Sequence, residues 1–399
     1  AYSKIYVIRG CLLRKKIKII RITTVPISLK KLLKGQLRFM NNFYEVIGVA
    51  SPGEELADVE REEGIRTIPL YMSRVLSPIG DIASLARMVR MLLRERPDIV
   101  HSHTPKAGIV AMLASFICNV PHRLHTVAGL PLMEATGLKR QVLLFVEWLT
   151  YKCATKVYPN SNGLKKYIIE NISVARCKLS VIGYGGSNGI DTKHFDRTEE
   201  VNRVARGLRK TLNLEGSFSF IFLGRIVKDK GIEELLAAFD KLSNESENVK
   251  LIIVGWEEND LDPMSGSART VLESNSSIIN VGFKDDVRPY LAISNCLTLP
   301  SYREGFPNVV LQACSMRLPC IVSDINGCNE IIQNTINGLV IKPKDAESLY
   351  LAMKKLVTDQ PLLESLSQQS RKGVVDKYSQ DFIHNEMLSE YERILNIDE

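Results

Sequence analysis

Two successive runs of alternating strand and helix patterns constrain the fold of this 399-residue chain more than any other feature. Short apolar runs alternate with longer segments whose apolar residues recur at helical spacing. The first run predicts strands at 18–25, 45–50, 98–101, 123–127, 156–158 and 179–182, and the second predicts strands at 219–223, 250–254, 278–281, 296–299, 320–322 and 339–341. Strands that alternate with helices form parallel sheets covered by helices on both faces, so the pattern predicts an α/β fold.

A glycine-rich stretch at 183–189 separates the two runs. We therefore expect two doubly wound, Rossmann-like domains of similar size, at 17–195 and 196–399, which face each other across a ligand cleft. The second domain includes a last helix at about 380–395, and residues 1–16 form a basic appendage. Ligands of such sheets bind at the carboxyl ends of the strands, so functional residues are expected directly after strands.

Apolar segments and cysteines bear on the compartment. The longest uncharged apolar run covers residues 107–118, which is shorter than the roughly 20 residues of a membrane-spanning helix. Residues 5–13 are apolar, but Arg9 interrupts them and no small-residue cleavage site follows, so we expect no secretory signal. The eight cysteines form no CxxC pair and no zinc-like cluster with histidine, which favours reduced thiols in a cytoplasmic protein.

Positive charge is concentrated in the first half of the chain. Residues 1–200 carry 30 basic and 17 acidic side chains, whereas residues 201–399 carry 22 and 28. This asymmetry favours an anionic surface or substrate, with solvated helix faces as the alternative, and we expect no nucleic acid partner. Cations crowd the first 38 residues at Arg9, Arg14, Lys15, Lys16, Lys30, Lys31, Lys34 and Arg38. Since the segment 29–39 mixes them with leucines, we expect peripheral attachment to the anionic inner face of the cell membrane.

Several catalytic and cofactor motifs are absent from the sequence. The stretch 183–189 lacks the closing glycine of a dinucleotide-binding GxGxxG, and the chain contains no Walker A, HExxH or GxSxG sequence. Asp260 and Asp262 form an Asp-x-Asp pair of the kind that holds a divalent metal, with a solvated acidic loop as the alternative. We expect neither a metal nor a cofactor.

The stretch SYREGFPNVVLQ at 301–312 is the first candidate for a ligand site. It follows a strand, and Pro307 suits the first position of a helix at 308–316. The free amides at the start of that helix favour a diphosphate. Glu304 and Gln312, which lies one turn beyond Asn308, are placed to bind two other parts of the same ligand. An ordinary strand-loop-helix corner is the alternative.

A second stretch, FIFLGRIVKDKG at 220–231, strengthens this interpretation. Its strand leads into Gly224, and Arg225 and Lys230 follow. Two cations after the first strand of the second domain can neutralise a diphosphate, the arginine as a fork and the lysine as a point charge. Solvated surface cations are the alternative for this stretch alone.

Together these stretches resemble the retaining glycosyltransferases of family four, which have the two-domain GT-B fold. The similar segments are GRIVKDKG in one stretch and SYREGFPNVVLQACSMRLPCIVSDINGCNEII, which extends the other. The segments ITTVPISLKKLLKGQL, DIVHSHTPKAGI, HTVAGLPL and SNGID are similar to the bacterial members that build capsule, O-antigen and exopolysaccharide repeats. The resemblance covers the chain from about Lys18 and implies an acceptor-side first domain and a nucleotide-sugar-binding second domain.

The resemblance also implies roles for individual residues. Arg225 and Lys230 match the ligands of the donor diphosphate, and Glu304 matches the carboxylate that holds the hydroxyls of the donor sugar. His125 matches an active-site histidine of the first domain, with a structural histidine at a strand end as the alternative. The remaining donor-binding positions are Gly224, Gly282, Phe283, Gly305, Phe306, Pro307, Asn308 and Gln312.

One position departs from the family pattern. Relatives carry a second glutamate where this chain has Gln312, and that glutamate normally accepts hydrogen bonds from ribose hydroxyls. The amide oxygen of Gln312 accepts such a bond without a charge, and its NH₂ group accepts none. Asn295 stands where relatives often carry aspartate.

The expected function is the transfer of a hexose or N-acetylhexosamine, with retention, from a nucleotide-diphosphate sugar to a lipid-linked sugar acceptor. The donor is expected to be a UDP-sugar and the acceptor a polyprenyl-diphosphate-linked sugar at the inner membrane face. The alternatives are a nucleotide-sugar 2-epimerase of the same fold and a catalytically weak homologue that binds a nucleotide sugar, for which Gln312 is the best argument.

Overall fold

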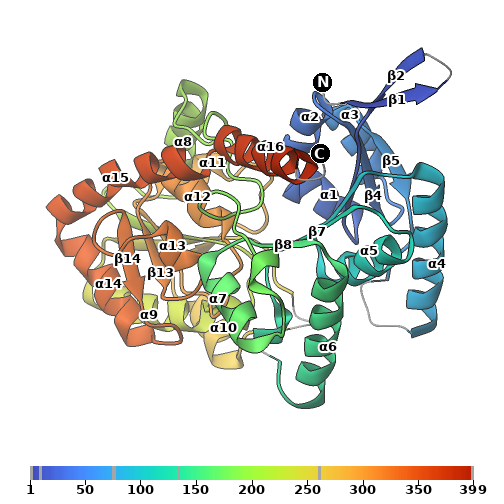
Figure 1. Cartoon of the computed structure of the whole chain (residues 1–399). Coiled ribbons are helices and arrows are strands. Elements are labelled where there is room, and N and C mark those ends of the chain that lie inside the picture. Colours follow the sequence, from blue (N-terminus) through green and yellow to red (C-terminus); the bar gives the residue numbers. More distant parts are fainter. Residues whose placement is uncertain (1–2, 9–10, 74–77, 134, 259–261, 397–399) are drawn as a thin grey trace. The chain divides into compact units, whose positions relative to one another are not determined.

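The computed structural model describes residues 3–8, 11–73, 78–133, 135–258 and 262–396, and divides into two compact units (Figure 1). The first unit comprises Ala1–Asn188 together with Gln380–Glu399, and the second comprises Gly189–Ser379. Each unit is built on one six-stranded parallel sheet.

The sheet of the first unit has the strand order β5-β4-β3-β6-β7-β8. Its strands are β3 (Lys18–Ile22), β4 (Glu45–Ala50), β5 (Arg66–Pro69), β6 (Ile99–Ser102), β7 (His122–Val127) and β8 (Lys156–Pro159). Its helices are α1 (Pro26–Leu32), α2 (Gln36–Asn41), α3 (Glu55–Glu63), α4 (Pro78–Glu95), α5 (Pro105–Ile117), α6 (Gly137–Cys153), α7 (Asn162–Asn171) and α16 (Gln380–Asn396), with short 3-10 turns η1 (Pro131–Met133) and η2 (Arg176–Lys178). The strand order changes direction between β3 and β6, which makes this the switch point where doubly wound sheets bind ligands.

The sheet of the second unit repeats the same order, β11-β10-β9-β12-β13-β14. Its strands are β9 (Phe218–Leu223), β10 (Val249–Val254), β11 (Ile278–Asn280), β12 (Cys296–Leu299), β13 (Cys320–Ser323) and β14 (Gly338–Ile341). Its helices are α8 (Glu199–Thr211), η3 (Lys228–Lys230), α9 (Ile232–Glu245), α10 (Gly266–Ser274), α11 (Arg288–Ile293), α12 (Asn308–Ser315), α13 (Cys328–Ile331), α14 (Ala346–Thr358) and α15 (Gln360–Tyr378). The switch point lies between β9 and β12.

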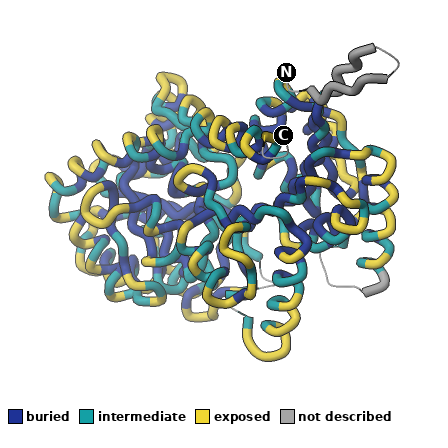
Figure 2. Tube along the Cα trace, viewed as in Figure 1, coloured by how far each residue is buried: buried dark blue, intermediate teal, exposed yellow. Residues whose placement is uncertain are grey.

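The inner strands of both sheets are buried, while the helices expose their outer faces (Figure 2). All four side chains of β12 and all four of β13 are buried. Apolar runs without polar alternation are what a sheet covered on both faces requires. The predicted fold class, with two doubly wound Rossmann-like domains, is confirmed.

Ten of the twelve predicted strands occur within two residues of the expected bounds, and 18–25 is shortened to β3. The strand at 179–182 was wrong, because only Leu179 forms an isolated bridge, to Val157. The edge strand β5 and a hairpin of β1 (Ser3–Ile8) with β2 (Cys11–Lys16) were not predicted. The hairpin occupies the segment expected to be an appendage. Arg9 and Asp260 lie outside the described residues.

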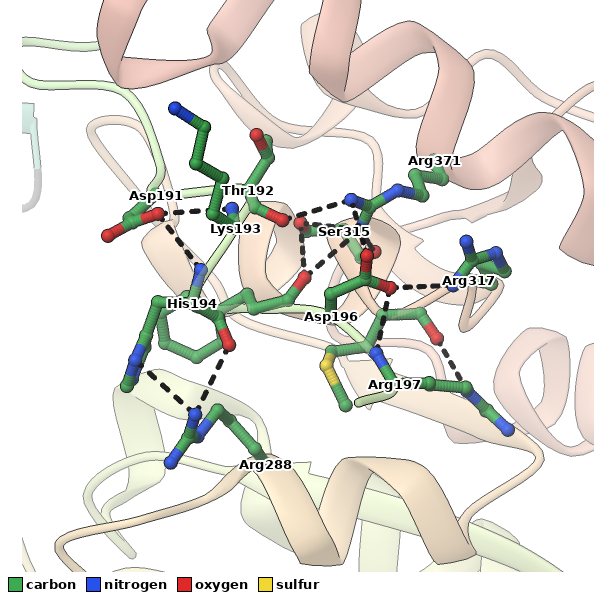
Figure 3. A network of polar contacts seen from close by, with 12 residues as sticks. Asp191, Thr192, Lys193, His194, Asp196, Arg197, Arg288, Ser315, Arg317 and Arg371 are labelled. Atoms are coloured by element: carbon green, nitrogen blue, oxygen red, sulfur yellow. Dashed lines mark hydrogen bonds and ion pairs between the residues drawn. The ribbon is translucent and has the colours of Figure 1, made fainter. Parts of the chain in front are cut away.

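The division between the units lies at Asn188 and Gly189, seven residues before the expected boundary. Residues 190–197 belong to the second unit and contact its other elements (Figure 3). Ile190 bridges to Ser379, and the Ser315 hydroxyl donates to the Phe195 carbonyl at 2.7 Å. The glycine-rich stretch itself, rather than the helix that follows it, therefore marks the end of the first unit.

The last helix, α16, belongs to the first unit rather than to the second, where we had placed it. Its Tyr391 hydroxyl lies 2.7 Å from His101 Nδ1, and the Tyr391 ring packs against Tyr44. Met387 and Tyr391 join the core below the sheet of the first unit. The contact of Tyr391 with His101 joins residues 290 positions apart, which a local sequence pattern does not record.

The basic segment at 29–39 differs from the expectation in one respect. Leu29, Leu33 and Leu37 are fully buried, so they are not available to insert into a membrane. Lys30 is paired with Asp58 at 2.7 Å. Exposed charge in this segment comes from Lys31, Lys34 and Arg38.

Candidate functional site

A lysine–glutamate pair stands at the switch point of the second sheet. Lys230 closes the turn η3 after β9, and Glu304 lies in the loop after the neighbouring strand β12. Lys230 Nζ is 2.6 Å from Glu304 Oε1, and the Ser301 hydroxyl donates to the same oxygen at 2.9 Å. Both side chains are mostly buried, with exposed fractions of 19% and 13%. The structure thus brings together two residues that the sequence placed 74 positions apart.

Two glycines fix the backbone around this pair. Gly231 has a φ of 70°, and a Cβ at this position would collide with the carbonyl oxygen of Pro300 at the end of β12. Gly327 has a φ of 78°, and a Cβ there would collide with the carbonyl oxygen of Gly305. Since only glycine combines a left-handed φ with such close backbone approach, both positions hold the Glu304 loop in place. Asn326 Nδ2 donates to the Glu304 carbonyl at 2.6 Å.

Arg225 follows β9 on the same edge of the sheet, after Gly224. Its guanidinium forms an ion pair with Glu258, which the sequence did not single out. The Arg225 side chain is 36% exposed, so it remains accessible to a ligand. Both predicted cations are therefore present at the strand ends, and each faces a carboxylate.

The helix α12 begins at Asn308, and Pro307 precedes it as the N-cap, with an extended ψ of 107°. Pro307 is therefore one residue earlier than predicted. The Pro307 carbonyl accepts from the amides of Val310 and Leu311, which leaves the amides of Asn308 and Val309 without an intrahelical partner. Amides at this end of a helix favour an anion.

The other end of α12 is held by a polar network (Figure 3). Arg371 donates to the Ser315 carbonyl, and Arg197 donates to the Met316 carbonyl at 2.9 Å. Cations at the carboxyl end of a helix are stabilised by its dipole. Asp196 accepts from Arg317 at 2.8 Å and from Arg371 at 3.1 Å, so the arginines are themselves paired.

Gln312 lies one turn into α12, as predicted, and is half-buried. Its side chain forms no hydrogen bond within the described ranges. Phe306 is buried against Tyr378, with ring centroids 5.3 Å apart, and its part in donor binding stays a prediction.

Two aromatic rings stand at the ends of β10 and β11. Phe283, which the sequence indicated, is 51% exposed, and Trp256, which it missed, is 48% exposed. Their ring centroids are 5.5 Å apart in an edge-to-face arrangement. The Gly282 carbonyl accepts from the amide of Gly255 at 3.1 Å and keeps the two strand ends together. The sequence did contain a signal for Trp256, since a tryptophan just after a buried strand indicates a ligand-facing ring.

His125 lies in the first unit, on β7, and is 2% exposed. Its Nδ1 is 2.8 Å from the Ser102 hydroxyl, and its ring fills the space beside Gly108, where a Cβ would collide with it. Burial lowers the pKa of His125 to about 4, so the imidazole is neutral at physiological pH. Its active-site role remains a prediction. His101 bridges Tyr391 and Thr126, and so has a structural part.

Across the described residues, no group of three or more histidine, cysteine, aspartate or glutamate side chains has the arrangement of a metal site. Asp262 Oδ2 accepts from the Asp229 amide at 2.7 Å, which is a structural role for one half of the Asp-x-Asp pair. Within the same ranges, no helix combines the length and apolarity needed to cross a membrane.

Two doubly wound units of identical strand order, with cations and a carboxylate at the switch point of the second, are the arrangement of a GT-B glycosyltransferase. Residues 206–373 match the family of glycosyl transferases group 1, and residues 38–185 match the glycosyl transferase 4-like domain. The chain belongs to the bacterial family-four glycosyltransferases.

Its similarity to individual relatives extends over nearly the whole chain. It is 32% identical to the capsular polysaccharide biosynthesis glycosyltransferase CapM of Staphylococcus aureus, over 96% of this chain and 98% of the relative. It is 31% identical to an Escherichia coli UDP-Gal:α-D-GlcNAc-diphosphoundecaprenol α-1,3-galactosyltransferase, over 77% and 78%. Among solved structures, Anabaena HepE in complex with UDP matches with a TM-score of 0.77 at 18% identity, over 95% of this chain and all of that one.

Proposed function

We propose that this enzyme transfers a hexose or N-acetylhexosamine, with retention, from a UDP-sugar to a polyprenyl-diphosphate-linked sugar during surface polysaccharide synthesis. The Lys230–Glu304 pair at the switch point carries this proposal. The names of the relatives from Staphylococcus aureus and Escherichia coli support the pathway and the lipid-linked acceptor. Because the proposed acceptor is a lipid-linked sugar, we place the enzyme at the cytoplasmic face of the membrane.

The chemistry assigns a part to each group at the strand ends. Lys230, Arg225 and the first amides of α12 stabilise the negative charge of the departing diphosphate, in the manner of an oxyanion hole. Glu304 accepts hydrogen bonds from the hydroxyls of the donor sugar. Phe283 and Trp256 offer a surface on which a planar base packs. The acceptor attacks the face that the diphosphate leaves, and a phosphate oxygen takes its proton.

Release of UDP tests this function. The enzyme is incubated with single UDP-sugars and a lipid-diphosphate sugar, and the products are analysed by mass spectrometry. We expect UDP release that depends on the acceptor. EDTA should change its rate by less than twofold, because side chains and amides neutralise the diphosphate. Complete loss with EDTA and rescue by Mn²⁺ would overturn the metal independence. Interconversion of the nucleotide sugar without acceptor would instead indicate a 2-epimerase.

Gln312 is expected to tune donor binding rather than catalysis. It lies a turn beyond the phosphate-facing end of α12, so its partner is the ribose, remote from the bond that breaks. A contact made equally in the ground and transition states changes KM rather than kcat. Gln312→Glu should strengthen the contact by about 1 kcal/mol, which lowers the donor KM several-fold.

Steady-state kinetics of Gln312→Glu at varied donor concentration measures this effect. Gln369→Glu, on the exposed face of α15, makes the same chemical change away from the site and should leave the donor KM unaltered. An inactive wild type whose Gln312→Glu variant gains turnover by orders of magnitude would mark the chain as a degenerate transferase.

Membrane attachment is expected to be electrostatic. Lys31, Lys34 and Arg38 are exposed, while Leu33 and Leu37 between them are buried. Each basic residue near an anionic leaflet contributes about 1 kcal/mol. Sedimentation with anionic liposomes should show salt-sensitive binding that falls at least tenfold when all three are changed to alanine. Equal binding to neutral vesicles would contradict the prediction.

A further inference from the structure

A pocket of about 400 Å³ lies at the switch point of the first sheet. It opens between the loop after β3 and the start of α5, where the hydroxyls of Thr24 and Thr104 are 2.7 Å apart. Its volume lies in the range of roughly 300–1,000 Å³ that is typical of small-molecule sites. Its polar lining includes Thr24, Ser28, Thr104 and Glu147, and its apolar lining includes Ile109, Leu143 and Val146.

The polar groups at the N-terminal end of α5 already form hydrogen bonds within the protein, which argues against a phosphate ligand. The Thr24 hydroxyl accepts from the amide of Ala107 at 3.2 Å, and the Thr104 carbonyl accepts from the amide of Gly108 at 2.7 Å. Among the described lining residues, the single cation is Lys106, and it forms an ion pair with Asp81 at 2.5 Å. The pocket therefore suits an uncharged group.

One wall of the pocket combines apolar side chains with a buried carboxyl group. Ile109 of α5 and Leu143 and Val146 of α6 supply apolar surface, while Glu147 of α6 is only 5% exposed. Its neighbour Tyr151 is fully buried, and the Tyr151 hydroxyl is close enough to Glu147 to stabilise the ionised carboxylate. A carboxylate has about four acceptor sites, so one tyrosine hydroxyl leaves Glu147 able to accept from a ligand donor as well.

We propose that this pocket binds the N-acetylated sugar of the acceptor, with the acetamido N–H donating to the Glu147 carboxylate. This inference rests on the proposed function. The acetyl methyl group packs against Ile109, Leu143 and Val146. Ser28 and Thr104 face the hydroxyls of the sugar ring. A plain hexose has no methyl group for the apolar wall, so burial there would strip water from a hydroxyl without compensation. The pocket thus selects an acceptor that carries an N-acetylamino sugar.

Kinetics with two acceptors tests the selection. The probes are synthetic diphospholipids that share one lipid and differ in the sugar, which is N-acetylglucosamine or glucose. With wild type, the acceptor KM should be at least tenfold lower for N-acetylglucosamine. Glu147→Leu should raise that KM at least tenfold and remove most of the difference, while the donor KM is unchanged. Leu138→Ala, on the exposed face of the same helix, is the matched control.

A binding measurement separates the pocket from turnover. In saturation-transfer NMR with methyl N-acetylglucosaminide and no donor, the acetyl methyl protons should give the strongest signal. Val146→Phe, which fills the pocket, should abolish that signal. Equal KM values for the two acceptors, or an NMR signal that survives Val146→Phe, would overturn the pocket assignment and leave glycosyl transfer intact. Transfer to neither lipid, with the NMR signal present, would overturn the proposed function instead.

Discussion

Lys230→Ala should lower kcat/KM by 10²–10³, which corresponds to a loss of about 2–4 kcal/mol of transition-state stabilisation. The ammonium group of Lys230 lies 2.6 Å from Glu304, at a point where the side chains are largely screened from water. Removing this group takes away a positive charge whose attraction to the diphosphate is strongest in the transition state, when the diphosphate departs. It also leaves Glu304 without its cation, so the loop that holds the donor sugar loses an anchor.

Two further variants sharpen this test. Arg225→Ala should cause a loss of the same order, because Arg225 is the second cation at the same strand end. Lys228→Ala is the control in the same turn, since Lys228 is 53% exposed and lies 3.8 Å from Glu233. Initial rates at several donor concentrations, with melting temperatures recorded for each variant, separate catalysis from folding. Activity within threefold of wild type for both Lys230→Ala and Arg225→Ala would refute the diphosphate site.

The sequence predicted most of the strands because the inner strands of both sheets are buried on both faces. The strands β4 and β12 have the predicted bounds, since continuous apolar runs between turn residues identify them directly. The edge strand β5 was missed because two of its four residues are exposed and the other two are only partly buried, which leaves no apolar run. The place of α16 depends on Tyr391 reaching His101 across the fold, and helical periodicity alone carries no such information.

For the candidate site, the sequence placed Arg225, Lys230 and Glu304 after strands, and the structure brings Lys230 and Glu304 together. The carboxylate that faces Arg225, Glu258, was not predicted because an acidic residue in a loop has no distinctive pattern. The buried Glu147 did carry a signal. It is the single charged residue within the run VLLFVEWLTY, and a carboxylate in the apolar face of a helix is usually there for a reason other than packing.

Glu147→Gln should stabilise the protein at alkaline pH and have little effect in acid. Burial raises the pKa of Glu147 from its ordinary value of 4.5 to about 7, and the nearby Tyr151 hydroxyl offsets part of this increase. Between pH 4.5 and 7 the folded protein therefore keeps a proton that the unfolded chain has lost. Stability falls as the pH rises through this window, by about 3 kcal/mol in total, and the glutamine variant does not pay this cost.

Urea unfolding at pH 4.5 and pH 8 measures the difference. In a Trp256→Phe background, Trp148 of α6 is the one remaining tryptophan and reports on the unit that contains Glu147. The two proteins should unfold at similar urea concentrations at pH 4.5, and the Glu147→Gln variant should be more stable at pH 8. Glu170→Gln, at an exposed position on α7, changes the net charge equally and should show no such pH dependence. A wild type as stable as Glu147→Gln at pH 8 would mean that a donor already satisfies the carboxylate. A confirmed penalty would instead mean that the fold keeps a destabilising charge, as expected where a side chain serves a ligand rather than the core.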